Sequence, residues 1–255
     1  VTGSMHQVST RLLLTSTLLA IALLTTGTAS AQRAPAPEQL LRAWLSAQAQ
    51  TVRQAGEVSF TEEAQRVLDG PFGKRTLRVR SRQTGDPGTN DWKRDILAAS
   101  ANGRVLTPSE FDRLERLSDH LAGARADRLL QELLFPARAL ARMRPVGPIA
   151  REKIGGVAAW RFDVARTRYA RAPVQRMTIW IGADRADLLH TRTILERTAD
   201  GSTLTVDTDY ERVQGLDVPT GRHIEGTIRT RRRIRTFTLL LRVDSDYSGY
   251  RIDRK

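Results

Sequence analysis

The chain has 255 residues, no cysteine and a formal net charge of +13, with 41 Lys and Arg against 28 Asp and Glu. The lack of cysteine excludes a disulfide framework, a thiolate nucleophile and a thiolate metal site. The positive charge favours anionic partners such as anionic lipids, although a preference for arginine on the surface would explain it equally well. No zinc-finger spacing or aromatic-rich RNA-binding motif accompanies the charge, so we predict no nucleic-acid partner.

Residues 1–31 have the features of a cleavable export signal. A single positive charge, Arg11, precedes an apolar stretch from Leu12 to Leu24, and small residues end the segment at Ala31. A membrane anchor is the alternative, but the apolar stretch is shorter than the roughly 20 residues that span a bilayer. We predict cleavage after Ala31, which leaves residues 32–255 as one domain in the periplasm. No cysteine follows the signal to carry a lipid, so we expect the mature protein to be soluble.

Periodicity predicts a helix and then four strands in the first part of this domain. Apolar residues recur at helical spacing over residues 39–55, where Gln48 interrupts the apolar face. From about residue 58 the pattern changes to period two, which indicates strands separated by turn residues. These strands are expected at residues 60–68, 74–82, 92–99 and 104–106.

A helical insert and a second set of strands are predicted for the rest of the chain. Thr107-Pro108-Ser109-Glu110 has the composition of a helix start, and helical spacing continues to residue 135. A further short helix is expected at residues 137–143. Beyond Pro148 the pattern is again that of strands joined by short turns. Six strands are expected, at residues 157–167, 175–181, 188–197, 202–213, 222–229 and 234–244.

The order of these elements and five C-terminal segments resemble the periplasmic lipoprotein-carrier and lipoprotein-sorting family. The segments are Met177–Ile181, Leu188–Arg197, Asp200–Val206, Asp209–Val213 and Gly215–Pro219. The resemblance implies a mainly β (α+β) fold: an incomplete antiparallel β-barrel of about ten strands, with an N-terminal helix and a helical lid insert. It covers the C-terminal strands well, the insert by position and the N-terminal strands by order. Residues 245–255 lack a clear extra strand and helix beyond residue 252.

The resemblance also implies a function in sorting lipoproteins to the outer membrane. An open sheet with an apolar concave face leaves a cavity of ligand size. Such a carrier shields a lipid or the acyl chains of a lipoprotein, acts as a monomer and is not an enzyme. An envelope sensor or interaction module with the same fold is the alternative. Carriers of the family hold an arginine on an early strand that ties the lid shut, and Arg66, Arg78 and Arg80 each fit that position.

Apolar residues of the insert and of the strands are candidates for the wall of this cavity. Each could equally belong to a closed core, which is the ordinary role of such side chains. The candidates are Leu129, Leu130, Leu133, Leu134, Ile179, Ile181 and Leu239.

Residues for catalysis or metal binding are few. Of the four histidines, His120, His190 and His223 lie in the predicted domain, and none has the spacing of a zinc ligand. No Gly-x-Ser-x-Gly motif is present in the sequence. We therefore predict no catalytic residue, no metal and no cofactor.

Two charged runs lie on the predicted strands. Asp207, Asp209 and Glu211 alternate along one strand, which is typical of a solvated face, with a cation site or an acid/base pair as the alternative. Arg229–Arg235 holds five arginines where one strand turns into the next. It is either an exposed hairpin tip or a contact for anionic lipid head groups on a membrane surface. The head-group candidates are Arg231, Arg232 and Arg233.

Overall fold

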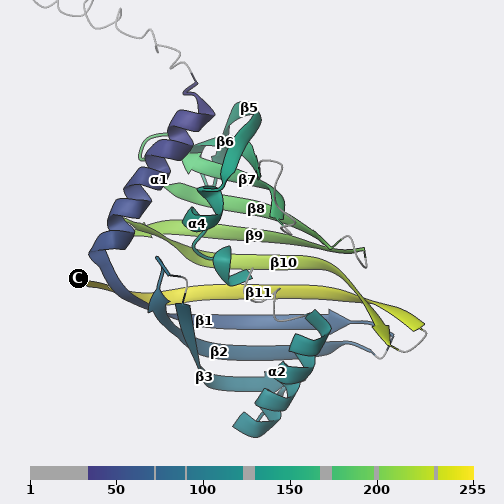
Figure 1. Ribbon diagram of the computed structural model, residues 1–255. Coiled ribbons are helices and arrows are strands. Elements are labelled where there is room, and N and C mark those ends of the chain that lie inside the picture. Colours follow the sequence, from purple (N-terminus) through teal and green to yellow (C-terminus); the bar gives the residue numbers. More distant parts are fainter. Residues whose placement is uncertain are drawn as a thin grey trace, which may run out of the picture. The chain divides into compact units, whose positions relative to one another are not determined.

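One antiparallel sheet contains all the strands that the structure describes. The computed structural model (Figure 1) describes residues 34–71, 73–89, 91–122, 130–166, 174–197, 201–232 and 235–255, so the predicted export signal lies outside the described residues. The eleven strands follow the order β4-β3-β2-β1-β11-β10-β9-β8-β7-β6-β5. Their bounds are β1 Ala55–Asp69, β2 Arg75–Asp86, β3 Asp91–Ala101, β4 Arg104–Val105, β5 Met143–Ile154, β6 Val157–Arg166, β7 Val174–Gly182, β8 Leu188–Arg197, β9 Ser202–Val213, β10 Leu216–Arg232 and β11 Arg235–Arg254.

The sheet is open, because its two outermost described strands, β4 and β5, do not pair with each other. The first and last strands of the domain, β1 and β11, are neighbours, paired from Ala55 opposite Arg254 to Asp69 opposite Leu240. Strands β2 to β4 extend the sheet on one side of this pair, and β10 to β5 extend it on the other (Figure 1). The predicted mainly β fold, an antiparallel sheet that does not close into a barrel, is confirmed.

The sequence predicted ten strands, and the strand that it did not predict is β5. The helix expected at residues 137–143 is a single turn, α4 (Ala137–Leu140), and the chain enters β5 at Met143. Pro145 and Pro148 lie within β5, which pairs with β6 alone and with an irregular register after Val146. Proline has no amide hydrogen for a strand ladder, so an edge strand tolerates it where a central strand would not.

The last two strands are longer than predicted. β10 begins at Leu216 and not at residue 222, because a register shift between Pro219 and Gly221 allows pairing with β9 to continue past the proline. β11 continues to Arg254 and not only to residue 244, and this second half pairs with the beginning of β1.

Helix α1 (Pro37–Gln54) matches the predicted N-terminal helix. Pro37 lies in its first turn, where a missing amide hydrogen costs nothing, and Glu38 lies near the positive end of the helix dipole. The helix contacts β5, α4, β1 and β10, and Figure 1 shows it crossing the ends of the strands. Its buried residues are Leu41, Trp44 and Gln48.

Helix α2 (Pro108–Ala122) begins with the predicted start signal. The backbone N–H of Thr107 donates to Glu110 Oε2 at 2.9 Å, and the N–H of Glu110 donates to Thr107 Oγ1 at 3.4 Å, which is a capping box. The first of these hydrogen bonds is the main reason that the pKa of Glu110 falls to about 2. Phe111 anchors the helix to the sheet in a cluster with Val79, Ala99 and Leu106.

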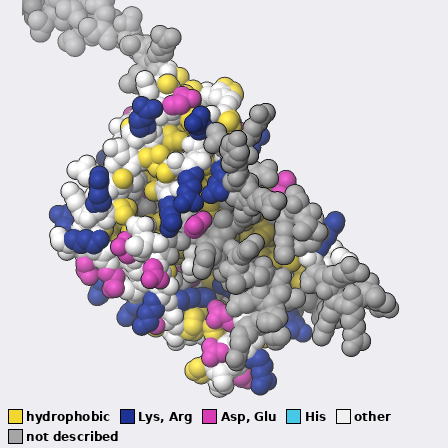
Figure 2. All heavy atoms as spheres, viewed as in Figure 1, with side chains coloured by type: hydrophobic (Ala, Val, Ile, Leu, Met, Phe, Trp, Pro, Cys, Tyr) yellow, Lys and Arg dark blue, Asp and Glu magenta, His cyan; other side chains and the backbone are white. Residues whose placement is uncertain are grey.

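The core lies on the face of the sheet that carries α1, α4 and residues 130–135, which we call the inner face (Figure 1). Its largest hydrophobic cluster joins α1 and α4 to side chains of β6 to β11. A second cluster joins Phe60 on β1 to Leu134, Phe135 and Tyr247. Figure 2 shows hydrophobic side chains reaching the surface beside α1, among scattered Lys and Arg side chains.

Candidate functional site

Residues 130–135, which we call the cover, lie against the inner face and bring several candidate residues together. Leu133, Ile179 and Ile181 are fully buried in one cluster, and Leu130 packs against it. Leu134 belongs to the second cluster, with Phe60 and Tyr247. The two remaining candidates are Leu239, which is half-buried on β11 beside Gly70, and Leu129, which lies outside the described residues.

Two side chains of the sheet hold the cover by its backbone carbonyls. Arg222 Nη1 on β10 donates to the carbonyl oxygen of Leu130 at 3.1 Å, and the hydroxyl of Tyr210 on β9 donates to that of Leu133 at 2.8 Å. Both residues are buried. A backbone carbonyl accepts such a hydrogen bond whichever side chain its residue has. The cover is therefore held on the sheet by hydrogen bonds to its backbone as well as by the packing of its leucine side chains.

The arginine that ties the cover differs from the residues predicted for that position. Arg78 donates to Gln65 at the surface, and Arg80 pairs with Glu63, both largely exposed. Among the early-strand candidates, Arg66 lowers the pKa of Glu62 and stays a prediction for this position, whereas the hydrogen bond to the cover that the structure shows comes from Arg222, on a late strand. Its signal in the sequence was hidden, because the register shift that precedes Arg222 changes which residues of β10 face inward.

Glu62 is a buried carboxylate on β1 that the sequence analysis did not identify. It is 5% exposed, and its partners come from β2, β10 and β11. Burial raises the pKa of Glu62, but Arg222 and two further arginines outweigh this effect and hold the pKa below its usual value. Glu62 is therefore an ionised group inside the domain. Its hydrogen-bond donors are Gln83 Nε2 (3.0 Å), Ser81 Oγ (3.4 Å), Tyr247 Oη (3.4 Å) and Arg222 Nη2 (3.5 Å).

A second buried carboxylate, Asp217, docks α1 onto the sheet. The indole N–H of Trp44 donates to Asp217 Oδ2 at 2.6 Å, and the backbone N–H of Leu188 donates to the same oxygen at 2.9 Å. Arg212 Nε donates to Asp217 Oδ1 at 2.8 Å, and this hydrogen bond raises the pKa of Arg212. Gln48, the polar residue on the apolar face of α1, accepts from the N–H of Asp217 at 3.2 Å. The position of Gln48 on the otherwise apolar face of the predicted helix was the one signal in the sequence for the contact between α1 and Asp217.

The acidic run on β9 lies on the face of the sheet opposite the inner face, which we call the outer face, and carboxylates of the run form ion pairs there. His190 lies between Asp209, at 2.7 Å, and Asp207, at 3.1 Å, and Arg192 also pairs with Asp207 at 2.7 Å. Within the described residues, no group of acidic and histidine side chains is arranged to hold a metal ion. These contacts agree with the solvated strand face that was the first interpretation of Asp207, Asp209 and Glu211.

The arginine run lies at the end of the β10–β11 hairpin, where sequence placed it. Arg231 pairs with Thr236 and Arg232 with Arg235 across the two strands, and Arg233 falls outside the described residues. The side chains of Arg231 and Arg232 are likewise not described, so their role as head-group contacts stays a prediction.

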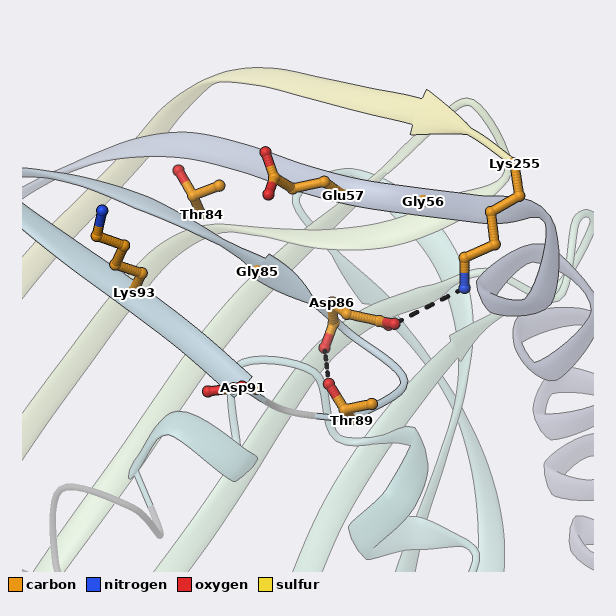
Figure 3. Close-up of a pocket in the computed structure, with 9 residues that line it drawn as sticks. All are labelled: Gly56, Glu57, Thr84, Gly85, Asp86, Thr89, Asp91, Lys93 and Lys255. Atoms are coloured by element: carbon orange, nitrogen blue, oxygen red, sulfur yellow. Dashed lines mark hydrogen bonds and ion pairs between the residues drawn. The ribbon is translucent and has the colours of Figure 1, made fainter.

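A polar cleft of about 410 Å³ lies at the opposite end of β1, where it meets the C-terminus (Figure 3). Lys255 Nζ lies 3.7 Å from Asp86 Oδ2, and Thr89 donates to the backbone carbonyl of Asp86. The mixture of charges and the lack of apolar side chains in its lining do not suit an acyl chain. The lining consists of Gly56, Glu57, Thr84, Gly85, Asp86, Thr89, Asp91, Lys93 and Lys255.

Comparison with known proteins yields no family model and no curated protein that matches the chain. A domain of an outer-membrane lipoprotein-sorting protein from Vibrio parahaemolyticus is 12% identical, covers 84% of this chain and 93% of its own, and has a TM-score of 0.43. A DUF1329 family protein from Desulfovibrio piger has the same identity and coverage and a TM-score of 0.39. MucB, in the Pseudomonas aeruginosa MucA/MucB complex, is 11% identical over 83% of this chain and 98% of its own, with a TM-score of 0.22.

A lipoprotein-sorting domain is thus among the solved structures that this chain resembles, as the sequence predicted. TM-scores below 0.5 carry no argument about function, which must come from the residues of this chain. Among the described residues, no helix combines the length and apolar character needed to cross a bilayer.

Proposed function

We propose that this is a periplasmic protein that binds lipid, or the acyl chains of a lipoprotein, on the inner face of its open sheet. The cover would move aside to admit the chain, and Ile179 and Ile181 on β7, together with Leu130 and Leu133 of the cover itself, would form the wall. Transport of lipoproteins toward the outer membrane is the use that this binding would serve.

One observation carries the proposal: the cover is fastened by single side-chain hydrogen bonds and not by a strand ladder. Arg222 and Tyr210 supply these bonds to Leu130 and Leu133. To open a closed barrel, the hydrogen bonds between two whole strands would have to break. Here the cover can move away while β8 to β11 stay paired with one another. The inner face beneath it is lined by Ile179, Ile181 and their neighbours.

The energies of opening and of ligand burial are comparable. Each of the two hydrogen bonds to the cover contributes about 1 kcal/mol net, and exposure of each of its buried side chains, Leu133, Leu134 and Phe135, costs about 2 kcal/mol, which makes about 8 kcal/mol in all. Each methylene of an acyl chain gains about 0.8 kcal/mol when it leaves water for an apolar site. A chain of about ten methylenes therefore offsets the loss of the cover's own contacts.

A second candidate, an interaction module, is favoured by the edge of the sheet at β3. Among the described residues, β3 pairs on its outer side with β4 alone, at Ser100 and Ala101, so most of this edge is left open there. Leu97 on β3 is 50% exposed and Val105 on β4 is 77% exposed. Open strand edges with apolar side chains are places where a partner strand can add.

Native mass spectrometry of protein purified from its own host tests the first function. We expect a co-purifying lipid, and a fluorescent fatty acid that binds the delipidated protein and is displaced by the natural lipid. Protein without bound lipid that also fails to bind the probe would contradict lipid binding. A co-purifying polypeptide in place of lipid would support the interaction module.

The role of the cover is tested by Tyr210→Phe, which removes the hydroxyl that donates to Leu133. We expect the fluorescent fatty acid to associate several-fold faster, because the closed state loses one of its two fastenings. Tyr250→Phe is the matched control, because the Tyr250 hydroxyl donates to the Pro219 carbonyl, which is not part of the cover. Equal association rates for the two variants would show that the cover does not limit access.

A further inference from the structure

A row of polar side chains crosses the inner face beneath the cover. Thr191, Thr208, Arg222 and Ser245 are successive partners on β8, β9, β10 and β11, so their side chains share one face in adjacent positions. Thr191, Thr208 and Ser245 are 1–3% exposed, and the Arg222 side chain is 9% exposed. We call these four residues the polar row.

The polar row lies beside an apolar one. On β9, β10 and β11 the next inward-facing residues, Val206, Ile224 and Val243, are again successive partners and belong to the largest hydrophobic cluster. A ligand that fits both rows must have a polar end and an apolar chain.

Three adjacent members of the polar row have atoms that make no hydrogen bond of normal geometry in the described part of the chain, and the hydroxyls of Thr208 and Ser245 have only weaker contacts with those of Tyr210 and Tyr247. The three atoms are Thr208 Oγ1, Arg222 Nε and Ser245 Oγ, all buried. Nearly all buried polar atoms in folded proteins are hydrogen-bonded, so three such atoms on neighbouring strands indicate an acceptor that completes them. Since one donor is a guanidinium, the acceptor that suits them best is an anionic oxygen.

We propose that Arg222, Thr208 and Ser245 bind the carboxylate or phosphate head group of an amphiphile whose chain follows the apolar row. This inference rests on the proposed function and adds to it the chemistry of the ligand. The head group replaces the Leu130 carbonyl as the hydrogen-bond acceptor of Arg222. Binding of the ligand therefore releases the cover from Arg222 in the same step.

In this arrangement the charge of Glu62 limits the affinity of the site for an anionic head group. Glu62 Oε1 lies 3.5 Å from Arg222 Nη2, so it balances the arginine's charge when no ligand is bound and repels an anionic head group when one arrives. Tyr247, whose ring lies 5.6 Å from the Arg222 guanidinium and whose hydroxyl bonds to Glu62, keeps both groups in place. Removal of the Glu62 charge should therefore strengthen binding, although the same change weakens a contact of the folded protein.

Competition against a fluorescent fatty acid tests the proposal with four competitors: palmitate, methyl palmitate, hexadecyl phosphate and inorganic phosphate. In the parent protein we expect palmitate or hexadecyl phosphate to bind about tenfold or more tightly than the uncharged ester, because a charge-assisted hydrogen bond is lost with the ester. Arg222→Met should bring this ratio close to one. Glu62→Gln should raise the affinity for the anionic amphiphiles several-fold and leave that for the ester unchanged.

Arg242→Met is the matched control, because Arg242 lies on β11 with its side chain exposed and paired with Asp244. It removes the same charge and should leave the acid-to-ester ratio as in the parent. If Arg222→Met does not fold, as judged by circular dichroism and thermal unfolding, the smaller changes Thr208→Val and Ser245→Ala should each lower the ratio.

The outcomes separate this inference from the proposed function. Equal binding of acid and ester by the parent, or a ratio that Glu62→Gln leaves unchanged, would overturn the head-group site and leave lipid binding intact. Failure of every amphiphile to bind would contradict the proposed function itself. Binding of inorganic phosphate that depends on Arg222, without displacement of the probe by amphiphiles, would assign the polar row to a free anion and overturn the proposal.

Discussion

At the scale of single residues, the buried carboxylate of Asp217 decides how α1 meets the sheet. Its two oxygens accept from Trp44, Leu188 and Arg212, which belong to α1, β8 and β9. Trp44, and Gln48 one turn later, which accepts from the N–H of Asp217, are the two contacts from α1, and both are made in only one angle and register of the helix. Hydrophobic contacts alone would allow α1 to slide along the inner face, so this carboxylate supplies the specificity that packing lacks.

We predict that Asp217→Asn lowers the free energy of unfolding by about 2–3 kcal/mol, because hydrogen bonds to a buried charged group are lost and one donor faces an amide N–H. Chemical denaturation measures the change. Asp244→Asn is the control on the outer face, where the carboxylate is 40% exposed, and there we expect a loss below about 1 kcal/mol. Similar losses in both variants would show that Asp217 has no special role.

A pH-dependent contribution to stability should come from His223. Its Nδ1 lies 2.6 Å from Asp244 Oδ1 and its Nε2 lies 3.4 Å from Glu225 Oε2, and the bond to Asp244 is the main reason that the pKa of His223 is raised above 6.5. The folded state thus binds this proton more tightly than the unfolded state. The contribution to stability is complete below about pH 6.5 and is lost as the pH rises through the folded-state pKa.

Titration of the His223 ring by nuclear magnetic resonance measures this shift directly. We expect a midpoint above 6.5 in the parent and a lower midpoint in Asp244→Asn, which loses the main partner. The difference in unfolding free energy between the parent and His223→Gln should shrink as the pH rises above about 6.5. A ring that titrates below 6.5 in the parent would contradict the prediction.

At the scale of elements, the sequence predicted those whose pattern is local. α1, β1 to β3 and β6 to β9 were placed within a few residues, because helical spacing, strand alternation and turn residues mark each of them. β5 was missed because its prolines are read as breakers, and only its edge position makes them acceptable. Glu62 and Arg222 were missed for another reason. They lie 160 residues apart in the chain, and only the pairing of β1 with β11 and of β11 with β10 brings them together.

The β10–β11 hairpin should attach the protein to anionic membranes through Arg231, Arg232 and Arg233. Each arginine near an anionic surface contributes about 1 kcal/mol, so changing all three to Ser should weaken binding to anionic vesicles by about two orders of magnitude. Co-sedimentation over a salt series measures this, and the remaining binding should depend less on salt. The same change at the exposed residues Lys74, Arg75 and Arg82 removes equal charge elsewhere. Equal binding by both triple variants would make the hairpin an ordinary solvated turn.

At the scale of the whole domain, the sheet consists of two sets of strands that meet at the β1–β11 ladder. β2, β3 and β4 reach the rest of the sheet only through β1, and β1 pairs from its first to its last residue with Leu240–Arg254 of β11. The Glu62 network and the second hydrophobic cluster both span this junction. The end of the chain, for which the sequence indicated no clear additional element, is therefore in the middle of the sheet and not at its margin.

Removal of residues 245–255 should for this reason prevent native folding. The deletion takes away the partners of β1 from Ala55 to Ala64 and the side chains of Tyr247, Tyr250 and Ile252 in the second cluster. We expect a product that is insoluble or that has strand content without cooperative thermal unfolding and binds a hydrophobic dye. Deletion of residues 254 and 255 alone is the control, because it removes one strand pair at the end of the ladder and should leave the unfolding transition cooperative. If the longer deletion also unfolds cooperatively near the parent's midpoint, the β1–β11 ladder is not what unites the two sets of strands, and the inner face must be held together by the clusters and the cover alone.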